Sequence, residues 1–294
     1  MEIILLHNRT AGDEEHSRRR LLEMLRADGH SVRYAELGAA LREPDRWRGG
    51  DLIVVAGGDG SFRKVVIRFP LEGRPLALLP LGTANNIART LGVEGSPESI
   101  IARWPRARRR RFSVGCVHGP WGRQRFVEGV GIGLFGRAIG ILKSWRNIRE
   151  HEDKDDRVLS DLRTLTMLAH ELHPIAAHVR IDGERVGESL LLLEALNISR
   201  VGPGVTLVPR ANFSDDCFDA VVVRASQRPD LIAALLDALH ESKRPRRLAS
   251  RPCRRIELVL PHCDLRIDDD TVEVRKGTRI EVRMSGEDVE VLEG

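Results

Sequence analysis

The stretch Val54–Ser61 constrains the fold more than any other part of this chain. It reads Val-Val-Ala-Gly-Gly-Asp-Gly-Ser, ends an apolar run and opens an amphipathic helix. Glycines such as Gly57, Gly58 and Gly60 let backbone N–H groups approach an anion with no Cβ in the way. The start of the next helix adds partial positive charge and unpaired donors. This pattern predicts a phosphate-binding loop between a strand and a helix.

Asp59 lies at the centre of this loop and decides how it could be used. A carboxylate repels bare phosphate, so it fits the loop only with Mg²⁺ or a proton donor between them. The alternative is a tight strand-to-helix turn in which Asp59 is a helix N-cap. The loop lacks the Gly-Lys-Ser/Thr ending of a P-loop and the spacing of a dinucleotide fingerprint. Ser61 adds a hydroxyl.

Two further loops follow apolar runs in the same way. One is residues 8–12, Asn-Arg-Thr-Ala-Gly, and the other lies within residues 79–89, Leu-Pro-Leu-Gly-Thr-Ala-Asn-Asn-Ile-Ala-Arg. Three such loops at the carboxyl ends of successive strands fit the rule for ligand sites in open α/β sheets. For the loop within residues 79–89, the alternative is that Thr83 and Asn85 only cap the following helix. The candidate phosphate-binding or nucleotide-binding residues of the two loops are Asn8, Arg9, Thr10, Gly12, Gly82, Thr83 and Asn85.

Hydrophobic periodicity divides the chain into two regions. In the first, strand-like runs alternate with helical stripes, which predicts an α/β domain with a parallel sheet. Near residue 108 the pattern changes to mostly strands with inserted helices. The predicted strands are 3–6, 31–36, 52–56, 76–79, 111–117, 126–130, 179–181, 190–198, 218–223, 272–275 and 279–284. The predicted helical stripes are 21–25, 62–69, 84–91, 134–145, 165–172 and 232–239, and the charged stretch 146–161 is expected to be an exposed loop or helix cap.

Composition favours a cytosolic protein of two domains. A chain of 294 residues exceeds what one core usually serves, and 41% hydrophobic with 31% charged residues is enough to build cores. No apolar run approaches the roughly 20 residues of a membrane span. No signal peptide is expected, because Met1 leads straight into a strand. The four cysteines lack metal spacing, which favours reduced thiols.

The net charge of +4 arises largely from the run of arginines within residues 103–111. Such a run is either a solvated connector between domains or a contact with an anionic membrane surface, worth about 1 kcal/mol per Lys or Arg. The sequence does not favour either interpretation of the run over the other. Nucleic acid is disfavoured, because aromatics make up only 4% of the chain and do not interleave with the basic run. The oligomeric state, a homodimer included, stays open.

These motifs resemble the diacylglycerol kinase catalytic-domain family, which includes bacterial lipid kinases and is related to sphingosine and ceramide kinases and, more distantly, to NAD kinases. The family patterns Asn-Pro-x-x-Gly, Gly-Gly-Asp-Gly-Thr and Leu-Gly-Thr-x-Asn-Asp-x-Ala-Arg match residues 8–12, 57–61 and 81–89 in the same order. The resemblance implies a nucleotide-binding α/β kinase domain over residues 1–107. It also implies a β-sandwich lipid-binding domain with inserted helices over residues 108–294.

The same resemblance implies an ATP- and Mg²⁺-dependent kinase that phosphorylates diacylglycerol or a related lipid alcohol in the cleft between the domains. Asp59 would engage the nucleotide through Mg²⁺. Asp268, in Ile-Asp-Asp-Asp, stands where the family has the general base of Val-Asp-Gly-Glu, and Asp270 stands for its nucleotide-holding glutamate. Asp215 and Asp216 lie in the family's structural Mg²⁺ segment. The enzyme would be cytoplasmic and peripherally membrane-associated.

Several departures keep alternatives open. Cys217 replaces the glycine of the metal segment, so a solvated acidic turn is an equal reading there. Asp269 replaces the glycine beside the expected base, and three adjacent carboxylates repel unless a cation compensates. Residues 181–184, Ile-Asp-Gly-Glu, match the family letters better, but chain order favours Asp268. A non-catalytic lipid or nucleotide sensor and a kinase of a soluble substrate such as NAD are the alternatives.

Overall fold

The computed structural model describes residues 1–11, 16–146, 153–242 and 246–294 and divides the chain into two compact units. Unit 1 is Met1–Phe112 with Asp288–Gly294, and unit 2 is Ser113–Glu287. The C-terminal residues thus belong with the first unit, whereas the sequence placed the whole of 108–294 in the second domain. Two strands, β5 (Arg108–Gly119) and β18 (Thr278–Glu293), carry the chain across the division. Gly12 lies outside the described residues.

Unit 1 is an α/β domain around a parallel sheet, as predicted. Its strands are β1 (Glu2–His7), β2 (Ser31–Glu36), β3 (Leu52–Gly57) and β4 (Leu76–Pro80), in the order β2-β1-β3-β4. Its helices are α1 (Arg18–Ala27), α2 (Leu37–Ala40), α3 (Asp59–Arg68), α4 (Asn86–Thr90) and α5 (Pro97–Arg103), with short 3₁₀ turns at Pro44–Trp47 and Trp104–Arg106. Every residue of β3 is buried, as expected of a strand covered on both faces of a parallel sheet.

Local signals set the ends of α1. The Ser17 side chain accepts a hydrogen bond from the Arg20 N–H and so satisfies one donor of the first turn. The helix ends at Ala27, and Gly29 follows with φ +80°, a conformation that L side chains rarely adopt. Gly29 therefore marks the stop of α1.

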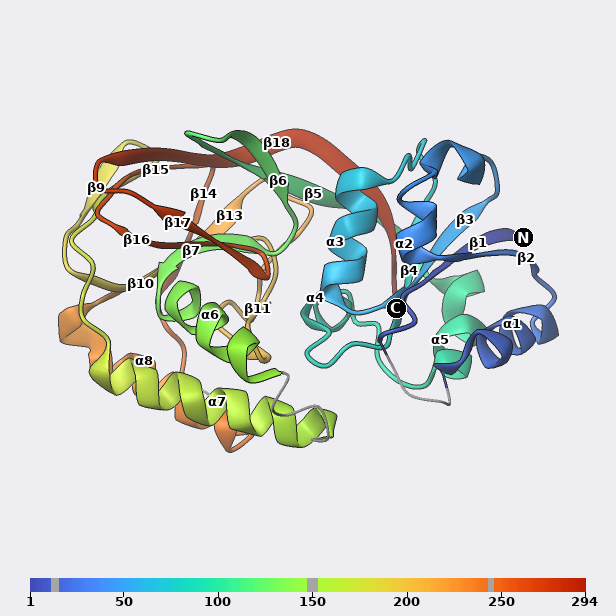
Figure 1. Cartoon of the computed structure of the whole chain (residues 1–294), viewed down its shortest axis with the longest axis horizontal. Helices are drawn as coiled ribbons and strands as arrows, with labels where there is room; N and C mark the ends of the chain where they lie inside the picture. Colours follow the sequence, from blue (N-terminus) through green and yellow to red (C-terminus); the bar gives the residue numbers. More distant parts are fainter. Residues whose placement is uncertain (12–15, 147–152, 243–245) are drawn as a thin grey trace. The chain divides into compact units, whose positions relative to one another are not determined.

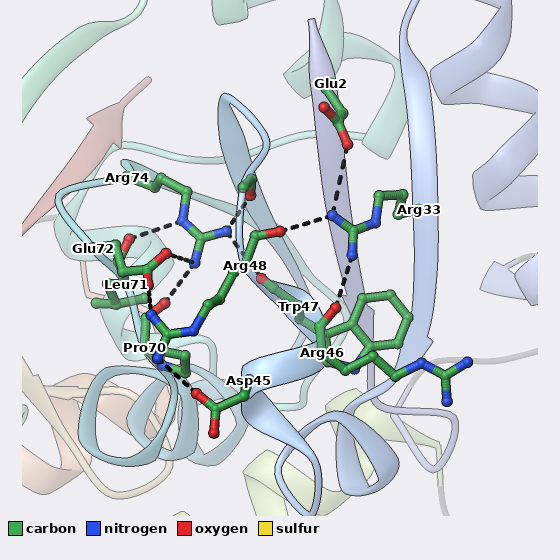
Figure 2. Close-up of polar contacts among 11 residues, drawn as sticks. Glu2, Arg33, Asp45, Arg46, Trp47, Arg48, Pro70, Leu71, Glu72 and Arg74 are labelled. Atoms are coloured by element: carbon green, nitrogen blue, oxygen red, sulfur yellow. Dashed lines mark hydrogen bonds and ion pairs between the residues drawn. The ribbon is translucent and has the colours of Figure 1, made fainter.

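A buried arginine fastens the amino-terminal edge of the sheet in unit 1 (Figure 2). Arg74 is 8% exposed and donates to the carbonyl oxygens of Leu71 (2.9 Å), Pro70 (2.6 Å) and Trp47 (3.0 Å), and also to that of Gly49. These carbonyls come from the segments that lead into β3 and β4. One guanidinium therefore joins both entering loops, at the edge of the sheet opposite to the three glycine-containing loops.

Unit 2 contains two antiparallel sheets that share a core. One has the order β14-β13-β10-β7-β16-β17, and the other includes β18-β15-β8-β9 with the hairpin β5-β6. Buried residues from both sheets, such as Phe126, Leu193 and Ile256, form a single hydrophobic cluster between them. The remaining strands are β6 (Gly122–Phe126), β7 (Gly129–Gly133), β8 (His178–Ile181), β9 (Glu184–Gly187), β10 (Leu190–Leu196), β11 (Arg200–Val201), β12 (Val205–Thr206), β13 (Phe218–Arg224), β14 (Ser250–Cys253), β15 (Arg255–Leu260), β16 (Cys263–Ile267) and β17 (Asp270–Val274).

Three helices of unit 2 form a second cluster with β10 and β13. They are α6 (Leu134–Arg146), α7 (Lys154–Glu171) and α8 (Arg228–Leu239), and a 3₁₀ turn at Ala225–Gln227 precedes α8. Helices α7 and α8 lie side by side (Figure 1). Their predicted apolar stripes are buried in this cluster. The predicted architecture, a parallel α/β domain followed by a β-sandwich with inserted helices, is confirmed.

One local prediction needs correction, and a second is decided between its two alternatives. The strand expected over residues 126–130 is interrupted, because β6 ends at Phe126 and β7 begins only at Gly129. The interruption turns successive N–H groups toward one carboxylate, as described below. The charged stretch 146–161 enters α7 at Lys154, where the Asp153 side chain accepts a hydrogen bond from the Asp156 N–H. Its helix-cap alternative is therefore correct, and residues 147–152 lie outside the described part of the chain.

Candidate functional site

The three predicted loops of unit 1 follow β1, β3 and β4 at one edge of the parallel sheet. Backbone hydrogen bonds join them: the Asn8 N–H donates to the Ala56 carbonyl (2.9 Å), and the Leu81 N–H donates to the Gly57 carbonyl (3.1 Å). The carboxyl ends of parallel strands meet at such an edge, where ligands of α/β proteins usually bind. The loops therefore form one continuous surface, as the sequence analysis required.

Asp59 connects the second loop to the third. Its Oδ2 accepts a hydrogen bond from the Asn86 N–H (2.9 Å), and its Oδ1 accepts one from the Ile87 N–H (2.9 Å). Asp59 therefore caps α4, whereas α3, the helix that it begins, has Gly58 as its N-cap. The alternative that Asp59 caps a helix is therefore correct, but the helix is α4, which follows the third loop, and not α3. The carboxylate is fixed at the point where both glycine-rich loops meet.

Glycine is required where these loops touch. A Cβ added to Gly82 would lie 2.6 Å from the Cα of Gly58 and 2.8 Å from the Oδ1 of Asn85. Backbone therefore lies directly against backbone, and a side chain could be placed there only by moving a loop. Such close approach leaves N–H groups accessible to an anion, including those at the start of α3 that have no intrahelical partner.

Asn8 ties the first loop to the second. Its Nδ2 donates to the Oγ of Ser61 (3.2 Å), and its Oδ1 accepts a hydrogen bond from the Thr10 hydroxyl (2.9 Å). Arg9 points elsewhere: its side chain is 67% exposed and lies 3.7 Å from a Glu36 carboxylate oxygen. The structure thus brings Asn8, Thr10 and Ser61 together, and it leaves Arg9 at the periphery.

Asn85 has an unusual conformation and an unpaired atom. Its φ is +49°, and its Nδ2 donates to the Gly82 carbonyl (2.8 Å). Its Oδ1 is buried and has no hydrogen-bond partner within the described residues. A buried acceptor without a donor is rare and is usually satisfied by water or a ligand. This atom and the glycine-lined backbone fit a nucleotide phosphate with its hydrated cation. Thr83 is exposed beside them.

His7 was missed by the sequence analysis. It ends β1, is 3% exposed, and its Nδ1 lies 3.2 Å from the Tyr34 hydroxyl. Burial, and then the nearby Arg9, lower the pKa of the imidazole, so the neutral form is favoured. Its Nε2 is buried with no hydrogen-bond partner among the described residues. The available signal was a histidine that ends an otherwise apolar strand, directly before Asn8.

In unit 2, Asp268 lies at the turn between β16 and β17 and is 2% exposed. Its φ is +55°. Its Oδ1 accepts hydrogen bonds from the N–H groups of Val127 (3.1 Å), Glu128 (2.7 Å) and Gly129 (3.2 Å). Val127 and Glu128 interrupt the predicted strand, and Gly129 begins β7. The candidate base is therefore an anchored carboxylate, and any acceptor hydroxyl must approach a group that already accepts backbone donors.

A buried ion pair supports the Asp268 turn. The Arg266 Nη1 donates to the Asp268 carbonyl oxygen (2.7 Å), and its Nη2 donates to the Oε2 of Glu194 (2.5 Å). Arg266 is 2% exposed and Glu194 is fully buried. Burial raises the pKa of the Glu194 carboxyl, and Arg266 opposes that shift. The sequence analysis missed this pair, although a glutamate within the apolar run of β10 was a visible signal.

The three adjacent carboxylates avoid the repulsion expected from their spacing. Asp268 faces backbone N–H groups, Asp269 is exposed, and Asp270 forms an ion pair with the Lys143 Nζ (2.7 Å). Asp182, earlier in the chain, has the same arrangement as Asp268 but lies at the surface. It has φ +50° in the turn between β8 and β9, and its Oδ1 accepts from the Arg255 N–H (2.9 Å). The two similar motifs are therefore both hairpin turns, distinguished by burial.

The predicted metal residues each accept a hydrogen bond from the protein. The Asp215 Oδ1 accepts from the Cys217 N–H (3.0 Å), and the Asp216 Oδ1 accepts from the Ser113 hydroxyl (3.1 Å). Burial, and then the neighbouring Asp215, raise the pKa of Asp219. Among the described residues, no three His, Cys, Asp or Glu side chains are grouped as a metal site. The acidic-turn alternative agrees with these contacts.

The arginine run is partly neutralised within unit 1. Acidic side chains of β18 pair with three of its members: Arg109 with Glu290 (3.6 Å), Arg110 with Glu293 (2.8 Å) and Arg111 with Asp288 (3.4 Å). Three arginines of the run are therefore engaged with β18 within unit 1. Within the described residues, no helix combines the length and the apolar character that a bilayer crossing requires.

Comparison with known families adds independent information. Residues 2–117 match the diacylglycerol kinase catalytic domain, and residues 156–243 match the YegS C-terminal NAD kinase beta sandwich-like domain. Residues 2–117 therefore belong to the diacylglycerol kinase catalytic-domain family. This stretch contains all three loops of unit 1, so the predicted family is confirmed on the residues that suggested it.

Two bacterial proteins have sequences related to this chain. A diacylglycerol kinase of Bacillus subtilis (strain 168) is 29% identical over 214 residues, which cover 70% of this chain and 64% of the relative. A probable lipid kinase YegS-like of Pseudomonas putida is 30% identical over 189 residues, covering 64% of this chain and 60% of the relative. The alignments thus span less than two thirds of either relative.

Solved structures share the fold of the family. A putative diacylglycerol kinase from Bacillus anthracis str. Sterne has a TM-score of 0.71 at 18% identity, covering all of this chain and 96% of that one. An NAD kinase from Archaeoglobus fulgidus in complex with ATP has a TM-score of 0.51 at 14% identity, covering 99% and 93%. At these identities the likeness concerns the fold alone.

Proposed function

We propose that this protein is a lipid kinase that transfers the γ-phosphate of ATP to the hydroxyl of diacylglycerol or a related lipid alcohol, with Mg²⁺. The observation that carries the proposal is the junction at Asp59. Its carboxylate caps α4 while the backbones of Gly58 and Gly82 touch. A lone strand-to-helix turn needs no such junction between two loops. Family membership of residues 2–117 supports the kinase class.

In this proposal the three loops of unit 1 bind the nucleotide. N–H groups at the start of α3 and around Gly82 hold phosphate oxygens, and Asn85 Oδ1 accepts a donor from the hydrated ligand. Asp59 would engage the nucleotide through Mg²⁺. The bound Mg²⁺ would spread the charge that develops on the transferring phosphoryl group. The loops are fixed, so they need little reorganisation when that charge develops. Electrostatic stabilisation by donors already in place is usually the largest contribution to catalysis of this kind.

Asp268 is proposed as the acceptor of the hydroxyl proton. Phosphoryl transfer passes through a loose transition state, so the attacking hydroxyl needs a positioned acceptor more than a strong base. The carboxylate is positioned by the N–H groups of Val127 to Gly129. Asp270 is proposed to hold the nucleotide, for which it must exchange Lys143 for the ligand. A transient contact with an anionic membrane surface would supply the lipid.

The test is the transfer of radiolabelled γ-phosphate from ATP with Mg²⁺ to micellar lipid alcohols, with NAD as a soluble control. Label in a lipid is the expected result, and label in NAD alone would overturn the proposal. The Asp268→Asn variant is expected to reduce kcat by at least about 100-fold, the contribution typical of a general base. Asp182→Asn is the matched control, because Asp182 has the same turn geometry at the surface.

A further inference from the structure

Unit 2 contains a hollow of about 830 Å³ that none of the family motifs uses. It lies on the outer face of the sheet that contains β8, β9, β15 and β18, three of which are labelled in Figure 1. Ligand sites commonly have volumes of about 300–1,000 Å³. We call it the sheet-face hollow and define it by the side chains of Arg180, Arg185, Glu257, Arg279 and Glu281, which line it.

Strand register places like charges opposite each other in the sheet-face hollow. Arg180 on β8 is directly opposite Arg185 on β9, and Glu257 on β15 is directly opposite Glu281 on β18. On its other side Arg180 is opposite Glu257, although the two side chains form no ion pair among the described residues. Directly opposite like charges destabilise a sheet. The glutamates are compensated, because Arg255 forms ion pairs with both, at 3.0 Å to each.

The arginines of the hollow are compensated less completely. Arg185 forms an ion pair with Glu188. Within the described residues the Arg180 guanidinium forms no ion pair and donates to the Gly183 carbonyl oxygen (3.0 Å). The Arg279 side chain forms neither a hydrogen bond nor an ion pair there. The acidic residues of the hollow are thus paired while two guanidinium groups keep free donors. This asymmetry favours an anionic ligand.

We propose that the sheet-face hollow binds a phosphate group, carried either by a soluble phosphomonoester or by a lipid headgroup. Guanidinium groups from β8, β9 and β18 present planar forks of donors, which suit the several oxygens of a phosphate. A second copy of this chain fits less well. Its carboxylates on the same face are already paired with Arg255, so they offer few free acceptors to the arginines of another copy. The proposal is independent of the kinase reaction.

Calorimetric titration of the full-length protein with glycerol 3-phosphate tests the proposal. A non-hydrolysable ATP analogue with Mg²⁺ is kept saturating, so that the loops of unit 1 are occupied. Arg180→Gln and Arg279→Gln are each expected to weaken binding about tenfold or more. Arg283→Gln is the matched control, because Arg283 is exposed on β18, loses the same charge and does not line the hollow. It is expected to change binding by less than about twofold.

Vesicles of phosphatidylcholine with and without phosphatidic acid distinguish the two sources of phosphate. Binding only to the phosphatidic acid vesicles, with the same order of variants, assigns a lipid headgroup, whereas saturable binding of glycerol 3-phosphate assigns a soluble ligand. If all three variants weakened binding equally, the effect would come from the net charge of the protein and not from the hollow, and the proposal would be overturned. It is also overturned if neither probe binds, or if the two hollow variants abolish self-association without affecting either probe.

Discussion

Removal of Arg266 should expose the cost of the buried carboxylate that it neutralises. The Arg266→Met variant keeps an unbranched side chain of similar length but leaves Glu194 fully buried without a counter-charge. Breaking a buried pair by removing one partner typically costs about 3–5 kcal/mol of the free energy of unfolding. Protonation sets an upper limit on this loss of the free energy of unfolding, because Glu194 without its counter-charge can bind a proton and become neutral.

That limit can be worked out from the usual pKa of the carboxyl, 4.5. Each unit of pH above it costs about 1.4 kcal/mol of protonation free energy. At pH 7 the cost is therefore about 3.4 kcal/mol, and at pH 5 it falls to about 0.7 kcal/mol. The lost hydrogen bond to the Asp268 carbonyl adds about 1 kcal/mol at either pH. The variant should thus be less stable by about 4 kcal/mol at pH 7 and about 2 kcal/mol at pH 5.

The sign follows from proton linkage. Burial raises the pKa of Glu194 in the folded state, so at pH values between 4.5 and that raised pKa the folded protein binds more protons than the unfolded chain. Stability from this group is complete below the unfolded pKa of 4.5 and decreases as pH rises through the raised folded pKa. Without Arg266 the raised value is higher still, and the variant's deficit must grow with pH.

Urea unfolding followed by far-UV circular dichroism at pH 5 and pH 7 measures the deficit. The double variant Glu194→Met/Arg266→Met is the control, because an apolar pair in a buried site is often as stable as the ions that it replaces. It should recover most of the stability and lose the extra pH dependence. A deficit that is equal at both pH values, or a double variant no better than the single one, would refute the reasoning.

Three further predictions concern single positions. Gly82→Ala places a Cβ against the Gly58 backbone, so it should cost about 1–3 kcal/mol of stability and weaken ATP binding measured by calorimetry, whereas Gly38→Ala, with room at a helical position, should do neither. Arg74→Met leaves several carbonyls at the opposite sheet edge unpaired and should cost about 2–4 kcal/mol in urea unfolding while leaving the Km for ATP unchanged. Burial raises the pKa of the Cys253 thiol to about 12, so iodoacetamide at pH 8 should modify it only after unfolding, and fast modification of the native protein would contradict this.

The parallel domain was predictable because its signals are local. The buried run of β3, the helical stripe of α3 and the glycine after α1 each act within a few residues, so their structures follow from sequence spacing. The partners of Asp59 were not predictable in the same way. They lie 27 and 28 residues away, and only the pairing of β3 with β4 brings them together.

The environment of Asp268 was equally out of reach of the sequence. Its backbone donors at Val127 to Gly129 are about 140 residues away, and the apolar letters around them suggested a continuous strand. In a continuous strand those N–H groups would donate to a neighbouring strand. Because the strand is interrupted, they donate to the Asp268 carboxylate instead, and this arrangement depends on tertiary contacts that hydrophobic periodicity does not report.

The two proposed catalytic carboxylates share a construction that affects how their variants must be interpreted. Asp59 and Asp268 each accept N–H groups from a distant segment, so each joins two parts of its own unit. An asparagine there turns one acceptor oxygen into a donor that faces another donor, which loosens the structure as well as removing the charge. Loss of activity in Asp268→Asn alone would therefore not establish a base. Asp182→Asn makes the same substitution in an exposed turn, so it controls for the loss of a backbone acceptor in solvent. Urea unfolding of both variants measures the additional loosening at the buried Asp268, and a loss of activity in folded Asp268→Asn is then assigned to the carboxylate.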